Sequence, residues 1–140
     1  EINTAMPEYV VEHVARALNE SRKAINGSKI LVLGLAYKKN IDDIRESPSI
    51  ELIELLRSRG AKVDYNDPYI QTTHKQREHD LKMKSVPLTP AAIKGYDCVV
   101  ISTDHDSYDY EMIIKNAPVV VDTRNACARV KGAKKNVYKA

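Results

Sequence analysis

The residues best suited to bind a ligand lie in a charged segment, residues 34–48, that follows a short apolar run. Its cations and acids are interleaved, and they are Lys38, Lys39, Arg45, Asp42, Asp43 and Glu46. Lysine supplies a point charge and arginine a two-pronged donor, so the segment could bind a phosphate or a sugar. It is also longer than the roughly two to six residues that usually connect a strand to a helix. A solvated charged loop is the simpler interpretation, and composition alone favours it.

Polar residues also follow each of the other expected strands, at residues 66–68, 102–106 and 122–125. In an open parallel sheet the carboxyl ends of the strands border one crevice, so these segments should share an edge. Arg124 comes directly after the last expected strand. We therefore expect Lys38 and Arg124 to meet over one rim, where they could hold a diphosphate.

The elements that would position these residues alternate between strand and helix. Strands are expected at residues 30–33, 61–65, 98–101 and 119–122, and helices at 47–59, 90–95 and 109–116. This order predicts an α/β fold, a Rossmann-like, doubly wound and mainly parallel sheet with helices on both faces. Residues 71–84 are expected to form a loop or a short surface helix, and the basic residues 129–140 a solvated tail.

An amphipathic helix is expected ahead of the sheet, from Pro7 to about Asn19, because apolar residues recur there at helical spacing. The polar stretch after it contains Asn26-Gly27 and reads as a linker. We therefore divide the chain into a linker helix, residues 1–28, and one domain, residues 29–140. The helix could pack on a preceding domain or on the sheet.

Composition excludes several classes of protein. The 22 Lys plus Arg nearly balance the 19 Asp plus Glu, for a net charge of +3, which argues against a nucleic-acid-coating protein. There is no apolar run of about 20 residues and no secretory signal, so a cytoplasmic protein without a membrane partner is expected. The two cysteines, Cys98 and Cys127, are too few for a disulfide framework and are expected to be buried and inert.

Several catalytic and cofactor sites are disfavoured by the sequence itself. A dinucleotide fingerprint needs three spaced glycines, but only Gly34 is present, so the chain should not hold NAD by itself. Residues 104–106, Asp-His-Asp, are adjacent along one loop and rarely converge on a metal. A Cys127–His105 nucleophile pair lacks an orienting group. We therefore expect no catalytic residue and no metal ligand within the chain.

A phosphoacceptor receiver domain would share this strand order but is disfavoured by the positions of its required residues. It needs acids directly after the first strand and a lysine after the last. Asp42 and Asp43 lie too far from Gly34, and Arg124 stands where the lysine would be needed.

Four motifs carry a family resemblance: Gly34-Leu35-Ala36-Tyr37-Lys38, Asp42-Asp43-Ile44-Arg45-Glu46-Ser47-Pro48, Tyr65-Asn66-Asp67-Pro68 and Val121-Asp122-Thr123-Arg124. In order and spacing they resemble the C-terminal nucleotide-sugar-binding domain of the UDP-glucose/GDP-mannose dehydrogenase family, over nearly the whole chain. The segments Asn3 to Val11, Ser102 to His105 and Tyr108 to Tyr110 look most like the branch that acts on UDP-N-acetylhexosamines.

The resemblance implies one part of a three-part enzyme. An N-terminal domain would bind most of the NAD, a central helical domain would carry the catalytic cysteine, and this chain would close over the UDP-sugar. The family oxidises the sugar C6 alcohol to a carboxylate in two NAD-dependent steps, which supplies polysaccharide precursors. The expected partners are the UDP-sugar, the chain's own N-terminal and central domains, and further copies in a homo-oligomer.

The resemblance also implies roles for four residues. By motif position Tyr37, Lys38 and Arg124 would contact the UDP-sugar, and Arg45 would reach NAD across the domain cleft. The alternative is a non-catalytic α/β interaction module. In that case Lys38, Arg45 and Arg124 would form structural ion pairs with acids such as Asp42, Asp43 and Asp122.

Overall fold

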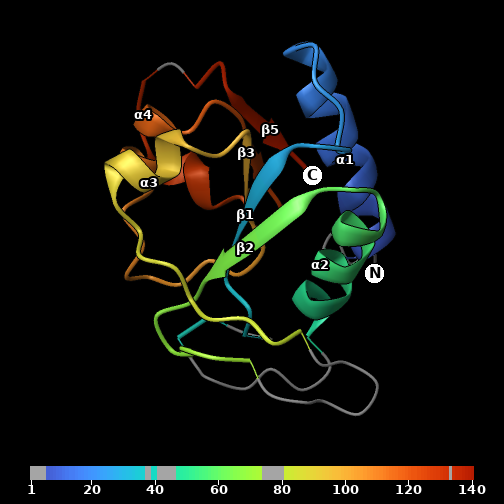
Figure 1. Cartoon of the computed structure of the whole chain (residues 1–140). Helices are drawn as coiled ribbons and strands as arrows, with labels where there is room; N and C mark the ends of the chain where they lie inside the picture. The colour runs from blue at the N-terminus through green and yellow to red at the C-terminus, as the bar shows by residue number, and fades with distance from the viewer. Residues whose placement is uncertain (1–5, 37–38, 41–46, 74–80, 133) are drawn as a thin grey trace.

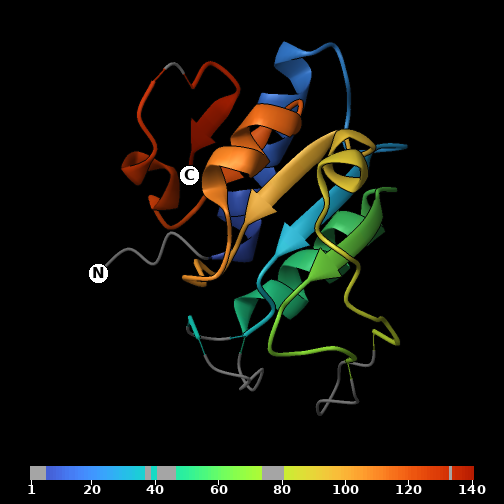
Figure 2. The same cartoon turned by 90° about the vertical axis from the view of Figure 1, so that its left-hand side faces the viewer.

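A parallel β-sheet between two layers of helices forms the core of the protein (Figures 1 and 2). A computed structural model describes residues 6–36, 39–40, 47–73, 81–132 and 134–140. In this part of the chain the strands are β1 (Lys29–Leu33), β2 (Lys62–Asn66), β3 (Cys98–Ile101), β4 (Val120–Asp122) and β5 (Val137–Lys139). The helices are α1 (Pro7–Glu20), α2 (Pro48–Ser58), α3 (Pro90–Lys94), α4 (Tyr110–Asn116) and the 3-10 helix η1 (Ala126–Arg129). The strand order is β2-β1-β3-β4-β5, and all neighbours are parallel.

The two faces of the sheet are covered by different helices, which Figure 2 shows from the side. Ile30 and Val32 of β1 point to the face packed by α1 and α2. Leu31 and Leu33 point to the opposite face, against α3 and α4. Because both faces are covered, the central strands are apolar along almost their whole length, as is typical of a parallel sheet. The predicted doubly wound α/β fold is confirmed.

The helices begin where polar caps and prolines predict. The Ser47 hydroxyl accepts a hydrogen bond from the amide of Ser49 and starts α2, with Pro48 in the first turn. Thr89 caps α3 in the same way, and Asp109 caps α4. Helix α1 packs through Val10, Val14 and other apolar residues into the core beside α2. It therefore lies on the sheet.

The C-terminal residues do not form the solvated tail that their charge predicted. The structure instead contains η1 and β5, which pairs with β4 and extends the sheet by one strand. The Asn136 side-chain amide donates to the carbonyls of Ile114 and Ala117, and Tyr138 packs against the core. Pairing with β5 provides hydrogen-bond partners for the backbone polar groups along the edge of β4. This gain outweighs the preference of the lysines for water.

The segment from 71 to 84 is described only in part, since residues 74–80 fall outside the described ranges. Its two ends meet in an isolated antiparallel bridge between Thr72 and Lys84, and Ser85 bridges to Tyr65 of β2. The described ends are not helical, and the prediction for residues 74–80 lies outside the described residues.

Gly34 ends β1 in a conformation that suits only glycine. Its φ is +93°, and a Cβ added there would lie 2.3 Å from the Cβ of Thr103. Both the left-handed backbone and the contact with the segment after β3 exclude a side chain. The close approach brings the loop after β1 directly against the end of β3.

Replacement of this glycine should therefore be costly. We predict that Gly34→Ala lowers the free energy of unfolding by about 3 kcal/mol or more, from positive φ and the clash together. Gly27→Ala is the matched control, because Gly27 has φ +86° but no atom within 4 Å of an added Cβ. Urea denaturation of both variants measures the difference, and equal losses would contradict a clash at Gly34.

Candidate functional site

The carboxyl ends of β1, β2, β3 and β4 converge on one edge of the sheet, as expected for parallel strands. Four segments meet there, residues 34–36, 66–69, 102–106 and 122–125. They are joined by hydrogen bonds between side chains and backbone, and they form the rim of the candidate site.

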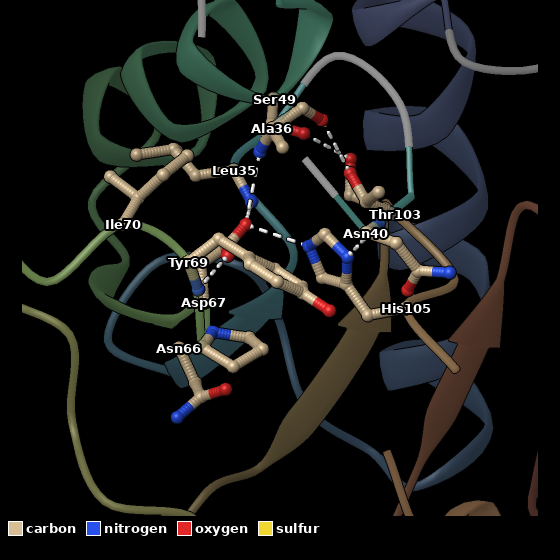
Figure 3. A network of polar contacts seen from close by, with 12 residues as sticks. Leu35, Ala36, Asn40, Ser49, Asn66, Asp67, Tyr69, Ile70, Thr103 and His105 are labelled. Carbon is tan, nitrogen blue, oxygen red and sulfur yellow. Dashed lines mark hydrogen bonds and ion pairs between the residues drawn. The ribbon is translucent and has the colours of Figure 1, made fainter. Parts of the chain in front are cut away.

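Asp67, the first residue after β2, is the centre of this rim (Figure 3). Its side chain is fully buried. One carboxylate oxygen, Oδ2, accepts from the amides of Leu35 at 2.7 Å and Ala36 at 3.0 Å, and lies 2.9 Å from Nε2 of His105. The other oxygen accepts from the amide of Tyr69 at 2.8 Å. One carboxylate therefore connects the ends of β1, β2 and β3.

These donors keep the Asp67 carboxylate charged in spite of its burial. Burial by itself raises the pKa of Asp67, but the hydrogen bonds from His105, Leu35, Tyr69 and Ala36 outweigh it, so the net pKa lies below its ordinary value. A buried charge is tolerated here because each oxygen has N–H donors.

His105 has partners at both ring nitrogens and no exposed surface. Its Nδ1 accepts a hydrogen bond of 2.7 Å from the amide of Asn40, so Nε2 carries the proton and donates it to Asp67. The ring packs between Tyr69 and Tyr108, at centroid distances of 4.9 and 5.6 Å. With both nitrogens engaged, His105 serves neither as a metal ligand nor as the base of a Cys127 nucleophile.

The loop after β1 is also held through the backbone carbonyls of the two residues whose amides bind Asp67. The carbonyl of Leu35 accepts from the Ser47 hydroxyl, and the carbonyl of Ala36 accepts from the Thr103 hydroxyl. Further along, the Asn40 side chain exchanges two hydrogen bonds with Asp106. Tyr37, Lys38, Arg45 and the acids Asp42 and Asp43 lie outside the described residues, so their predicted roles stay predictions.

Arg124 lies on the same rim, after β4. Its Nε donates to the carbonyl of Ser102 at 2.9 Å, and Ser102 is adjacent to the Thr103 that binds Ala36. Arg124 and the start of the β1 loop are therefore hydrogen-bonded to two consecutive residues after β3, Ser102 and Thr103. An open pocket of about 420 Å³ lies beside Arg124, and Lys139 also lines it. Sequence analysis missed Lys139, because the tail was not expected to form a strand.

Asp122 organises the turn that carries Arg124. Its buried carboxylate accepts from the amides of Arg124, Ala126 and Cys127. The side chains of Asp122 and Arg124, both described, form no ion pair. The other cations and acids of the interaction-module alternative lie outside the described residues, so that alternative stays open.

The first strand's turn does not fit the pyrophosphate of a dinucleotide. In a dinucleotide fold the amides after the first strand face the pyrophosphate. Here the amides of Leu35 and Ala36 donate instead to the negative carboxylate of Asp67. Together with the single glycine, this geometry argues against NAD binding at this turn.

A second pocket among the described residues and the two cysteines offer weaker sites. An open pocket of about 440 Å³ lies at the opposite, amino-terminal edge of the sheet, beside α1. Two of its cations are already paired, Arg59 with Glu12 and Lys23 with Asp97. Both cysteines are buried. Burial and the neighbouring Asp122 raise the pKa of Cys127 to about 12, which disfavours a thiolate.

Comparison with known proteins identifies the class of domain. The family model described as "UDP-glucose/GDP-mannose dehydrogenase family, UDP binding domain" matches residues 31–129. The UDP-N-acetyl-D-mannosamine dehydrogenase of Pyrococcus horikoshii is 32% identical over 129 residues, which cover 89% of this chain and 28% of that protein. The UDP-N-acetyl-D-glucosamine 6-dehydrogenase of Salmonella typhi is 27% identical over 107 residues, 76% of this chain and 24% of that protein.

Solved structures agree with this result. The crystal structure of the NDP-N-acetyl-D-galactosaminuronic acid dehydrogenase of Methanosarcina mazei matches with a TM-score of 0.73 and 25% identity, over 99% of this chain and 29% of that one. The domain is thus of the UDP-binding class. The chain belongs to the UDP-glucose/GDP-mannose dehydrogenase family, and it spans less than a third of the length of these relatives. Within the described residues no helix has the length and apolarity needed to cross a membrane.

The charge of Asp67 leads to a prediction about acid stability. Because the pKa of Asp67 is lowered by folding, its stabilising contribution is present above the unfolded-state pKa of about 3.9 and is lost as the pH falls through the folded value. We predict that Asp67→Asn lowers the free energy of unfolding by about 3 kcal/mol at pH 7. The deficit should shrink below about pH 4.

Denaturant unfolding across this pH range measures both effects. Asp109→Asn is the matched control, because Asp109 is exposed and asparagine caps a helix equally well. A deficit of Asp67→Asn that is the same at every pH would show that the carboxylate charge is not the stabilising feature.

Proposed function

We propose that the chain is the C-terminal substrate-binding domain of an NAD-dependent UDP-sugar 6-dehydrogenase that acts on a UDP-N-acetylhexosamine. Family membership supports a UDP-binding domain. The hexosamine specificity is supported by the relatives from Pyrococcus and Salmonella, which are named for UDP-N-acetylhexosamine substrates. The full protein would oxidise the sugar C6 alcohol to a carboxylate for polysaccharide precursors.

The observation that carries the proposal is the convergence of two segments over the end of β3. The loop after β1 is bound to Thr103, and the Arg124 side chain is bound to Ser102. Because Nε of Arg124 is held by Ser102, the two Nη nitrogens can point as a fixed fork toward an anion. We propose that this fork binds the diphosphate of the UDP-sugar.

The other predicted site residues complete the proposal. Tyr37 and Lys38 would contact the UDP-sugar from the β1 loop, and Arg45 would contact NAD. Since the turn after β1 does not suit a dinucleotide, NAD would be held mainly by a separate N-terminal domain. Residues 1–28 would connect residues 29–140 to a central domain, and the full protein would act as a homo-oligomer.

Because the proposal assigns NAD binding mainly to a separate domain, this chain alone should be inactive. We predict no reduction of NAD by the purified chain in the presence of a UDP-N-acetylhexosamine, because the catalytic cysteine and the NAD fingerprint of the family are absent from it. Absorbance at 340 nm measures the reaction, and turnover above a blank without protein would refute this assignment.

Binding of UDP should be weak but local. We predict that UDP shifts amide NMR signals in the strand-end loops, residues 34–40, 102–106 and 122–125, and not those near the α1 pocket. Uridine, which lacks the phosphates, is the control ligand and should give smaller shifts. An absence of shifts would instead favour the non-catalytic interaction module.

Loss of either cation should weaken binding. We predict that Lys38→Ala and Arg124→Ala each reduce the affinity for the UDP-sugar by about 1.5–3 kcal/mol, through loss of a charge-assisted hydrogen bond. Titration of the full-length enzyme measures the change. Arg57→Ala removes an exposed arginine at the end of α2 and should leave affinity unchanged. Unchanged affinity in both rim variants would remove these residues from the site.

A further inference from the structure

His105 and Asp67 hold the loop after β1 at two points, one before and one after residues 37 and 38. Asp67 binds the amides of Leu35 and Ala36, and His105 binds the amide of Asn40. The two side chains are hydrogen-bonded to each other. They come from different strand ends, Asp67 from β2 and His105 from the segment after β3, as Figure 3 shows. Together they form a continuous chain of hydrogen bonds between the two anchor points of the loop.

From this arrangement we propose that His105 is a positioning residue for UDP-sugar binding, which acts by fixing the loop anchors at Leu35, Ala36 and Asn40 through Asp67. The inference rests on the proposed function, since it concerns the loop assigned to the UDP-sugar. His105 itself has no exposed surface, so its proposed effect passes through the loop anchors.

Imidazole is the side chain that suits this position. One ring nitrogen must accept from Asn40 while the other donates to Asp67, which the neutral ring with its proton on Nε2 does. A leucine could fill part of the volume between Tyr69 and Tyr108, but it would leave the Asn40 amide without this acceptor. It would also remove one of the donors to the buried carboxylate.

The anchors at Leu35, Ala36 and Asn40 are held without a ligand. Anchor residues that are already ordered lose less conformational entropy on binding than residues that the ligand must order. The bonds from Ser47 and Thr103 fix the carbonyls of Leu35 and Ala36 but do not reach Asn40. The His105 ring is therefore the link on which the far anchor of the loop depends, together with the Asn40–Asp106 contacts at the surface.

The test compares three substitutions of His105 in this chain. His105→Leu removes both hydrogen bonds, His105→Asn keeps an acceptor near the position of Nδ1, and His105→Gln keeps a donor near the position of Nε2. Tyr96→Phe is the matched control. It removes a partly buried hydrogen bond, from the Tyr96 hydroxyl to Asp64, that lies away from the rim. The Kd for UDP is measured by amide NMR titration, and the hydrogen exchange of the Leu35, Ala36 and Asn40 amides is followed in the same samples.

The expected result is a Kd raised about tenfold in His105→Leu, with faster exchange at Asn40, and unchanged binding in Tyr96→Phe. His105→Asn should recover part of the affinity and slow the Asn40 exchange again, which general destabilisation would not explain. Should His105→Leu fail to fold, the Asn and Gln variants decide between the same outcomes. Folded variants with the original Kd would overturn the positioning role, whereas a lack of UDP binding by the unaltered chain would contradict the proposed function itself.

Discussion

The buried carboxylate of Asp67 is the interaction on which the geometry of the rim depends. Three strand ends approach one another there. The ends of β1 and β2 present backbone amides that need an acceptor, and the segment after β3 presents the His105 imidazole. The Asp67 carboxylate accepts from all of them, namely the amides of Leu35, Ala36 and Tyr69 and Nε2 of His105. The charge would be costly in an apolar core, but the donors compensate for lost water. The folded sheet and the shape of its functional edge are therefore stabilised by the same group.

This use of the amides has a consequence for ligand binding. In a dinucleotide fold the amides after the first strand are free to bind phosphate, but here they are committed to Asp67. These two amides are therefore not free to bind an anion at this edge. Arg124 suits that role, because its Nε is held by Ser102 and its guanidinium lies beside an open pocket. The similarity to a dinucleotide-binding fold thus extends to the sheet but not to the turn after β1, whose amides at Leu35 and Ala36 are bound to Asp67.

Sequence patterns predicted the sheet because local and tertiary preferences agree. The apolar runs of β1 and β3, the caps Ser47 and Asp109 and the glycine of the first turn each point to one structure. The tail was predicted wrongly, because the short strand β5 is defined by pairing with β4 and by Asn136, not by its own composition. From residue type alone, the lysines of this segment were expected to form a solvated tail.

The candidate site was predictable only in part. The position of Arg124 after a buried strand placed it on the rim, and the structure agrees. The Asp67–His105 pair was missed, because nothing in the sequence links residues that are 38 positions apart. An aspartate directly before a proline at a strand end was the available signal, but it reads equally well as a turn.

The most direct test of this account is a crystal structure of the chain with UDP bound. The account predicts that the diphosphate lies over the Ser102–Thr103 segment, within hydrogen-bonding distance of the Arg124 guanidinium, with the Asp67–His105 contacts unchanged. A diphosphate bound at the amino-terminal edge beside α1, or at the rim but out of reach of Arg124, would contradict it.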